Sequence, residues 1–215
     1  MKRYLIVIVV VIMFLAGCAS ESAQYVEIAD PQTAILRLQE GNERYREASY
    51  NDGDISEAVR VENAREGQEP YAVIVTCSDS RVPPEHIFMS GIGELFVVRT
   101  AGNVIGKFEL GSIEYGVEHL QAKAVVVLGH TGCGAVDAAI KGEGTGYIQT
   151  IISEIKANIK GERDAATCEV LNVEQGVQKI LSSEIVKHLV DEGEVQVVGG
   201  LYDTETGEVK FFQPN

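Results

Sequence analysis

The sequence predicts an α/β domain, in which a mainly parallel β-sheet is flanked by helices. Four short apolar runs rich in β-branched residues are typical of strands covered on both faces: residues 71–76, 95–99, 124–128 and 195–198. Helical patterns separate these runs, at residues 111–120, 135–160 and 173–190. Because strands and helices alternate along the chain, we expect the strands to pair in parallel.

Further elements are expected at the two ends of this domain. Residues 31–49 predict an amphipathic N-terminal helical arm, since apolar residues recur near helical spacing and Pro31 follows Asp30, a good helix start. A second helix is expected at 56–66. Residues 209–212, which follow a turn, predict a short C-terminal edge strand.

The first residues have the composition of a secretory signal. Lys2 and Arg3 precede an apolar run that ends at Gly17-Cys18. The run is shorter than the roughly 20 residues that a membrane-spanning helix needs. The string Leu-Ala-Gly-Cys at 15–18 resembles the lipobox of bacterial lipoproteins, which implies a lipid on Cys18. The alternative is a plain signal peptide with an incidental cysteine.

These features divide the chain into three parts. Residues 1–17 are a signal peptide that is cleaved before Cys18, residues 18–30 are a tether, and residues 31–215 form a single domain. We therefore expect an exported protein that is lipid-anchored on the extracytoplasmic face of a membrane, either periplasmic or at the cell surface.

The charge balance excludes one class of partner. The chain carries 32 acidic and 18 basic residues, a net charge of −14. Because so acidic a chain repels phosphate backbones, we expect no nucleic-acid binding. Attachment to a membrane must come from the lipid rather than from a basic surface.

Two polar motifs follow predicted strands. Cys-Ser-Asp-Ser-Arg at 77–81 follows the first apolar run, and Gly-His-Thr-Gly-Cys-Gly at 129–134 follows the third. The carboxyl ends of parallel strands share one edge of the sheet, where ligands bind in open α/β folds. We therefore expect the side chains of both motifs to converge.

Three residues of these motifs suit a metal ion. Cys77, His130 and Cys133 offer two thiolates and one imidazole, a set that suits Zn²⁺. Three protein ligands leave a fourth position open, as in catalytic zinc sites. The alternative is a Cys77–Cys133 disulfide, which an exported chain permits. It leaves His130 and the polar cluster around Asp79 and Arg81 unexplained.

Asp79 and Arg81 form the second half of the candidate chemistry. They alternate along a segment predicted to be extended, so both are expected on the face that Cys77 uses. A guanidinium keeps a neighbouring carboxylate ionised and can hold it in one orientation. Such a carboxylate can orient a zinc-bound hydroxide by accepting its hydrogen bond. The alternative is a structural salt bridge at a strand end.

The motif Cys-Ser-Asp-Ser-Arg-Val-Pro at 77–83, together with 129–134, resembles the signature pair of β-carbonic anhydrases. The likeness covers nearly the whole mature chain and includes residues 38–42, 96–99, 113–115 and 199–203. It implies the β-carbonic anhydrase fold. It also implies one Zn²⁺ per chain, held by Cys77, His130 and Cys133, and a catalytic dyad of Asp79 and Arg81. In some relatives this aspartate itself binds zinc in a closed state.

The resemblance also implies a substrate pocket. Gln68 matches a glutamine that hydrogen-bonds substrate, and Phe96 and Tyr115 match aromatic residues of the small apolar CO₂ pocket. In such proteins the pocket lies at a dimer interface, so we expect a homodimer or a higher homo-oligomer. One departure is Thr100, where many members have asparagine.

The function that this likeness implies is the reversible hydration of CO₂ to bicarbonate and a proton by a zinc-bound hydroxide. An alternative on the same zinc site is hydrolysis of carbonyl sulfide or carbon disulfide. A nucleotide-binding module is disfavoured, because the glycine-rich turn at 129–134 is neither G-x-x-x-x-G-K-[ST] nor G-x-G-x-x-G. A remote alternative is a non-enzymatic lipoprotein with a Cys77–Cys133 disulfide.

Overall fold

The computed structural model describes residues 28–213, so the predicted signal peptide, Cys18 and most of the tether lie outside the described residues. The helices are α1 Pro31–Glu47, α2 Glu57–Glu66, α3 Pro84–Ile87, α4 Lys107–Glu118, α5 Gly134–Lys141, α6 Ile148–Ile159, α7 Ala165–Leu181 and α8 Glu184–Asp191, with a 3-10 turn, η1, at Ala101–Asn103. The strands are β1 Ala72–Cys77, β2 Leu95–Thr100, β3 Ala124–His130, β4 Gln196–Tyr202 and β5 Val209–Phe212.

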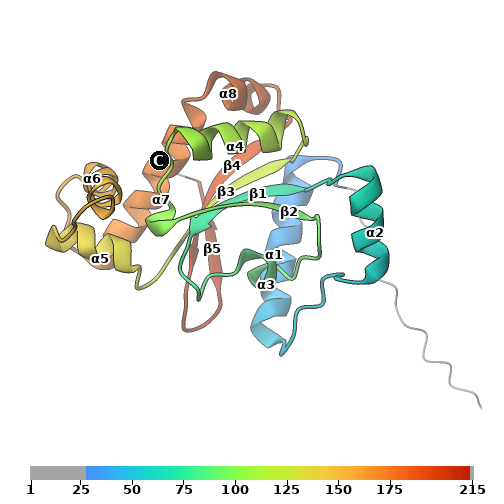
Figure 1. The fold of residues 1–215 in the computed structure, drawn as a ribbon, viewed down its shortest axis with the longest axis horizontal. Helices are drawn as coiled ribbons and strands as arrows, with labels where there is room; N and C mark the ends of the chain where they lie inside the picture. The colour runs from blue at the N-terminus through green and yellow to red at the C-terminus, as the bar shows by residue number, and fades with distance from the viewer. Residues whose placement is uncertain (1–27, 214–215) are drawn as a thin grey trace, which may run out of the picture.

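The strands form one sheet in the order β2-β1-β3-β4-β5 (Figure 1). The first four pair in parallel, and β5 runs antiparallel to β4 at the edge. The predicted α/β class and the short C-terminal edge strand are therefore confirmed. Because β1 and β3 lie side by side and point the same way, their last residues meet at one edge of the sheet.

Helices cover both faces of the sheet, as the continuous apolar character of the strands requires. On one face, Ile74 of β1 packs with Leu38 of α1 and with Phe88 just after α3. On the other face, Val73 packs with residues of α4, α7 and α8, among them Val177. All six residues of β1 are buried, which gives the Cys77 end of this strand a rigid base.

Two helices were predicted as single units and are in fact pairs. The span 135–160 contains α5 and α6, because α5 ends at Gly142, whose positive φ of 80° a glycine adopts readily. The span 173–190 contains the second half of α7 and nearly all of α8, which starts where the Ser183 side chain accepts the N–H of Val186. Both members of each pair bury apolar faces, so the hydrophobic pattern continues across the break.

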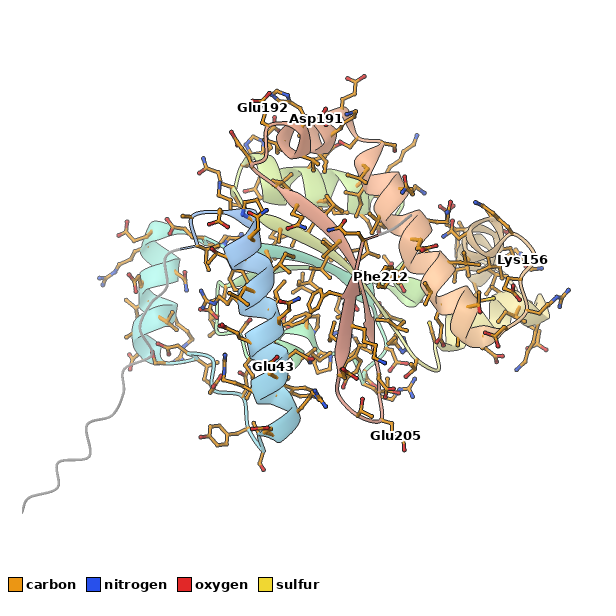
Figure 2. All side chains as sticks on the ribbon, turned by 180° about the vertical axis from the view of Figure 1, so that it is seen from behind. Glu43, Lys156, Asp191, Glu192, Glu205 and Phe212 are labelled. Atoms are coloured by element: carbon orange, nitrogen blue, oxygen red, sulfur yellow. The ribbon has the colours of Figure 1, made fainter. Side chains whose placement is uncertain are left out.

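Acidic side chains lie on several parts of the surface. Glu43 on α1, Asp191 and Glu192 at the end of α8, and Glu205 in the turn between β4 and β5 are all exposed (Figure 2). The negative charge that repels anionic polymers such as nucleic acids is therefore spread over more than one face of the protein. No helix within residues 28–213 is both long and apolar enough to cross a membrane.

Candidate metal centre

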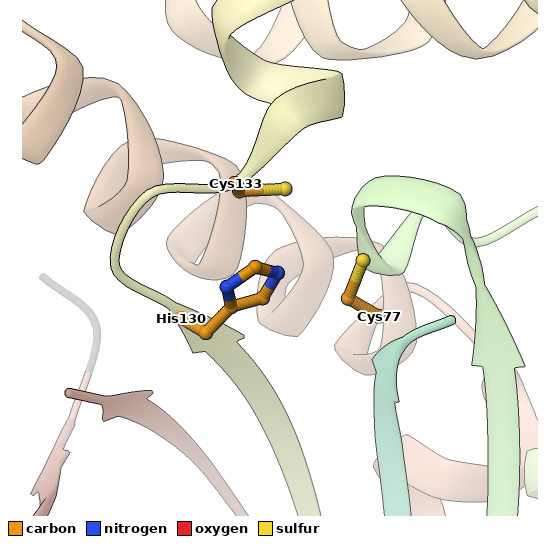
Figure 3. A group of neighbouring side chains, drawn as sticks. All are labelled: Cys77, His130 and Cys133. Carbon is orange, nitrogen blue, oxygen red and sulfur yellow. The ribbon is translucent and has the colours of Figure 1, made fainter. Parts of the chain in front are cut away.

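Cys77, His130 and Cys133 come together at the carboxyl edge of the sheet. Cys77 ends β1, His130 ends β3, and Cys133 stands just before α5. Their side chains point toward one another (Figure 3), with the potential ligand atoms all within 4.8 Å. The loop between His130 and Cys133 turns back sharply at Gly132, whose φ of +67° favours glycine. All three residues are buried.

The histidine ring is oriented as a metal ligand would be. His130 Nδ1 lies 3.0 Å from the carbonyl oxygen of Thr131, so Nδ1–H donates and Nε2 keeps its lone pair. Nε2 is buried and is one of only two such side-chain atoms in residues 28–213 without a hydrogen-bond partner. Because buried polar atoms are almost always satisfied, this lone pair fits a bound cation.

The two sulfur atoms add negative charge to the same space. The backbone N–H groups of Asp79 and Gly102 donate to Cys77 Sγ over 3.4 and 3.2 Å. The neighbouring Cys133 sulfhydryl, against the effect of burial, lowers the pKa of Cys77 well below its usual range. Cys77 beside it, together with burial, raises the pKa of Cys133. A second thiolate here therefore needs a cation, and Zn²⁺ with two thiolates and one imidazole fits this set.

The prediction that Asp79 and Arg81 alternate along an extended segment is wrong. β1 ends at Cys77, and a turn at Ser80-Arg81 follows it. Asp79 Oδ1 accepts the backbone N–H of Arg81 at 2.9 Å, so the two side chains converge across a turn rather than along a strand. Asp-Ser-Arg at this position favours such a turn, because aspartate readily accepts the N–H two residues on.

The Asp79 carboxylate is held in one orientation beside the ligand atoms. Arg81 donates to Asp79 Oδ1 from Nε (3.0 Å) and to Oδ2 from Nη2 (2.7 Å). Arg81 also holds the pKa of Asp79 well below its usual range, so the carboxylate is ionised at neutral pH. Asp79 Oδ2 lies 3.9 Å from His130 Nε2. This geometry suits an acceptor for a group bound at the metal centre.

A further arginine, for which the sequence analysis proposed no role, braces the loop. Arg99 Nε donates to the carbonyl of Cys77 (3.0 Å), and its Nη2 donates to the carbonyl of Asp79 (2.7 Å). The sequence offered one indication of this role: Arg99 lies near the end of β2, the strand that pairs with β1. Arg99 thereby fixes the backbone that carries both a predicted ligand and the predicted acceptor.

The predicted pocket residues lie elsewhere in the same chain. Gln68 precedes β1, at the end opposite to Cys77. Phe96 pairs with Val73 in register, four residues from the level of Cys77, roughly 13 Å along the strand. Tyr115 contacts Phe96, with ring centroids 6.1 Å apart. A single chain therefore does not bring these three residues to the metal centre.

The sequence model of the carbonic anhydrase family matches residues 72–209, which contain all three predicted ligands. The chain belongs to the carbonic anhydrase family. Carbonic anhydrase 2 of Mycobacterium tuberculosis is 38% identical over 189 residues, covering 83% of this chain and 91% of that protein. A carbonic anhydrase of Mycolicibacterium smegmatis is 34% identical, covering 85% and 93% of the two chains.

Solved structures agree on the class of this carbonic anhydrase. The β-carbonic anhydrase CafA of Aspergillus fumigatus superposes with a TM-score of 0.68 at 25% identity, covering 86% of this chain and 91% of that chain. A β-carbonic anhydrase of Sordaria macrospora superposes with a TM-score of 0.65 at 26% identity, covering 73% and 87%. The family and the fold together make the chain a β-class carbonic anhydrase.

The cysteines bear on the disulfide alternative. Cys77, Cys133 and Cys168 are all free in the part of the chain that the structure describes. The Cys77–Cys133 disulfide of the remote, non-enzymatic alternative therefore finds no support in the structure. The family match also favours an enzyme.

Proposed function

We propose that this carbonic anhydrase hydrates CO₂ with one Zn²⁺ held by Cys77, His130 and Cys133. The observation that carries the proposal is the convergence of two sulfurs on the unpartnered, buried Nε2 of His130. Bound zinc supplies an acidified water molecule that acts as the nucleophile near neutral pH. The chain's own residues hold the ligand atoms in place and orient the attacking water.

Asp79 is the orienting acceptor in this proposal. Its ionised carboxylate lies next to the ligand atoms and has only 20% of its side chain exposed, so it can accept a hydrogen bond from the attacking water. Arg81 fixes the carboxylate and also donates to the carbonyl of Gly132 at 3.1 Å, which ties it to the loop before Cys133. The same proximity allows the alternative resting state in which Asp79 itself binds the metal.

A second copy of the chain would complete the site. β2 is an edge strand, and its apolar residues Phe96, Val97 and Val98 remain half-exposed. If two copies pair antiparallel through β2, the start of one β2 lies beside the end of the other. Phe96 of one protomer, with Tyr115 and Gln68 nearby, would then approach the metal centre of its partner. The Sordaria macrospora enzymes are described as tetrameric, which fits an assembly built from such dimers.

The enzyme is also proposed to be an exported lipoprotein, on the pattern of residues 1–18. Expression of the full-length chain in a bacterium supplied with labelled palmitate should label the protein and send it to the membrane fraction. Cys18→Ser should remove the label and leave the metal centre intact. A wild-type protein that carries no label would contradict the lipid anchor.

The catalytic proposal is tested on the chain from Ala19 onward, loaded with zinc, by stopped-flow measurement of CO₂ hydration. Cys77→Ser is the control, because it removes one ligand while keeping the size of the side chain. Fast hydration by the wild type that disappears in Cys77→Ser supports the proposal. A wild type that binds one zinc per chain, fails to hydrate CO₂ and turns over carbonyl sulfide in a parallel assay would contradict the proposal. That result would support hydrolysis of sulfur gases at the same site.

A further inference from the structure

Helix α7 places two buried polar side chains beneath the pair of thiols. Glu169 and Asn172 are three residues apart and so share one face of the helix. Their exposed fractions are 6% and 2%. Each is linked by hydrogen bonds to a different cysteine of the metal centre, and neither is among the predicted ligands or the dyad.

Glu169 acts on Cys133. Its Oε1 accepts the backbone N–H of Cys133 at 3.1 Å, and no ion pair to Glu169 occurs among residues 28–213. Cys133 is the N-cap of α5, but its side chain makes no capping hydrogen bond. Because Glu169 takes the N–H, the backbone of Cys133 is fixed while its Sγ stays free to face the centre. A polar side chain is costly to bury without a partner, and the hydrogen bond with Cys133 offsets part of that cost.

Asn172 is linked to Cys77 by two hydrogen bonds that pass through the backbone of Gly102. Asn158 donates to Asn172 Oδ1 (2.8 Å), which orients the amide so that Asn172 Nδ2 donates to the carbonyl of Gly102 (2.8 Å). The N–H of the same glycine donates to Cys77 Sγ at 3.2 Å. Gly102 has φ +66°, and an added Cβ would lie 2.6 Å from Ile155, so this close approach requires glycine.

We propose that Glu169 and Asn172 are positioning residues that hold the two thiolates in their metal-binding arrangement. The inference rests on the proposed zinc site and extends it to a helix that contributes no ligand. Residues outside the ligand set that orient the ligands commonly change metal affinity about 10–100-fold when they are replaced. The pair belongs to α7, so α7 would couple Cys77 at the end of β1 to Cys133 at the start of α5.

The experiment compares acceptor and non-acceptor side chains at position 169. Glu169→Met fills the space without accepting the Cys133 N–H, whereas Glu169→Gln keeps an acceptor oxygen and removes the charge. Zinc affinity is measured by competition with a chromogenic chelator. Glu169→Met should bind Zn²⁺ roughly 10–100-fold more weakly, and Glu169→Gln should restore most of the affinity. Glu174→Met, on the same helix and half-buried, is the matched control and should bind as the wild type does.

A spectroscopic signature separates positioning from general stability. With Co²⁺ in place of zinc, the thiolate-to-cobalt absorption reports how the sulfurs meet the metal. Glu169→Met and Asn172→Leu should each alter this absorption, while Glu174→Met should not. Thermal unfolding of the metal-free variants checks that they remain folded. Asn172→Leu provides a second, independent variant if Glu169→Met does not fold.

The outcomes distinguish this inference from the proposed function. A wild type that binds no zinc would overturn the proposed function itself. A wild type that binds zinc, with Glu169→Met and Asn172→Leu equal to it in affinity and cobalt spectrum, would overturn the inference alone. If neither variant folds, Glu169 and Asn172 serve the stability of the fold rather than the position of the thiolates. That result would also overturn the inference.

Discussion

At the metal centre, the side chains of His130 and Asp79 are each fixed by hydrogen bonds within the chain, and each keeps an atom free to face the centre. His130 is held through Nδ1 and offers Nε2. Asp79 is held by Arg81, and its Oδ2 lies within 3.9 Å of His130 Nε2. Since these contacts exist within the chain itself, the site is organised before any substrate arrives, which lowers the cost of orienting the reactants.

Replacement of Asp79 by asparagine should reduce turnover while zinc stays bound. The amide keeps the shape of the carboxylate but carries no charge, so it accepts the hydrogen bond of the attacking water more weakly and cannot hold the ion pair with Arg81; we expect a loss in kcat of roughly 100-fold or more. Stopped-flow hydration and metal analysis on the same sample check this. Asp137→Asn, an exposed ion-pair partner of Lys141, should leave both unchanged. Loss of zinc from Asp79→Asn would instead make Asp79 a ligand in the resting enzyme.

Tyr71 should make the protein sensitive to alkali. Burial, partly offset by the hydrogen bond with Ser90, raises the pKa of Tyr71 from 10.0 to about 12. The folded protein thus keeps this proton at a higher pH than the unfolded chain does. Its contribution to stability is fully present below pH 10 and is lost as the pH rises towards 12.

Urea unfolding between pH 8 and pH 12 tests the role of Tyr71. Over this range the free energy of unfolding of the wild type should fall by about 2–3 kcal/mol more than that of Tyr71→Phe, which has no proton to lose. If the free energy of unfolding falls equally with pH in the two proteins, Tyr71 has the same pKa in the folded and the unfolded chain, and the prediction is wrong.

At the level of elements, small residues let neighbouring elements approach the sheet. Gly199 of β4 lies beneath the ring of Phe212 on β5, a residue that Figure 2 labels. Gly129 of β3 similarly faces Val173 of α7. Val173 also lies against Gly199, so Gly129 and Gly199 together set how closely α7, and with it Glu169, approaches the sheet.

Gly199→Ala should destabilise the fold. An added Cβ would lie 2.6 Å from the Phe212 ring, so the aromatic side chain must move, at a cost of about 1–3 kcal/mol. Gly111→Ala is the contrasting variant: it lies within α4 with nothing within 4 Å of the added Cβ, and it should stabilise by up to about 1 kcal/mol. Urea midpoints measure both, and equal shifts of the same sign would refute the packing explanation.

At the level of the whole molecule, we expect the open edge of the sheet to govern assembly and activity together. β2 carries unpaired backbone groups on one side and half-exposed apolar side chains, which is the kind of edge that pairs with another chain. Because Gln68, Phe96 and Tyr115 lie far from the metal centre of their own chain, the proposed pairing would bring them to the metal centre of a partner. The assembly and the substrate pocket are therefore expected to be lost together.

Val97→Lys should convert the assembled enzyme to monomers and reduce hydration, with one zinc per chain retained. Lysine on an edge strand opposes pairing through its charge, and Val97 is already half-exposed in the single chain. Analytical ultracentrifugation and stopped-flow hydration on the same preparation measure both effects. A fully active monomer, of either the wild type or Val97→Lys, would show that one chain suffices for catalysis.

Most of the fold followed from local patterns. The strand at 209–212 was predicted at its observed bounds, and the starts of β1 and β2 to within one residue. The helix breaks near Gly142 and Ser183 were missed because the apolar pattern runs through them. The turn at Ser80-Arg81 was mistaken for a strand because alternation of polar residues does not distinguish the two.

The sequence by itself determined the residue types at the ends of two strands, and with them the donor set Cys77, His130 and Cys133. Residue type and spacing carry this information because strand ends meet at one edge of a parallel sheet. Only the tertiary structure decided which atom of His130 is free, that Arg99, Glu169 and Asn172 support the loops, and that the pocket residues lie far from the metal centre. These are contacts between segments distant in sequence, and no local pattern encodes the partner of a hydrogen bond.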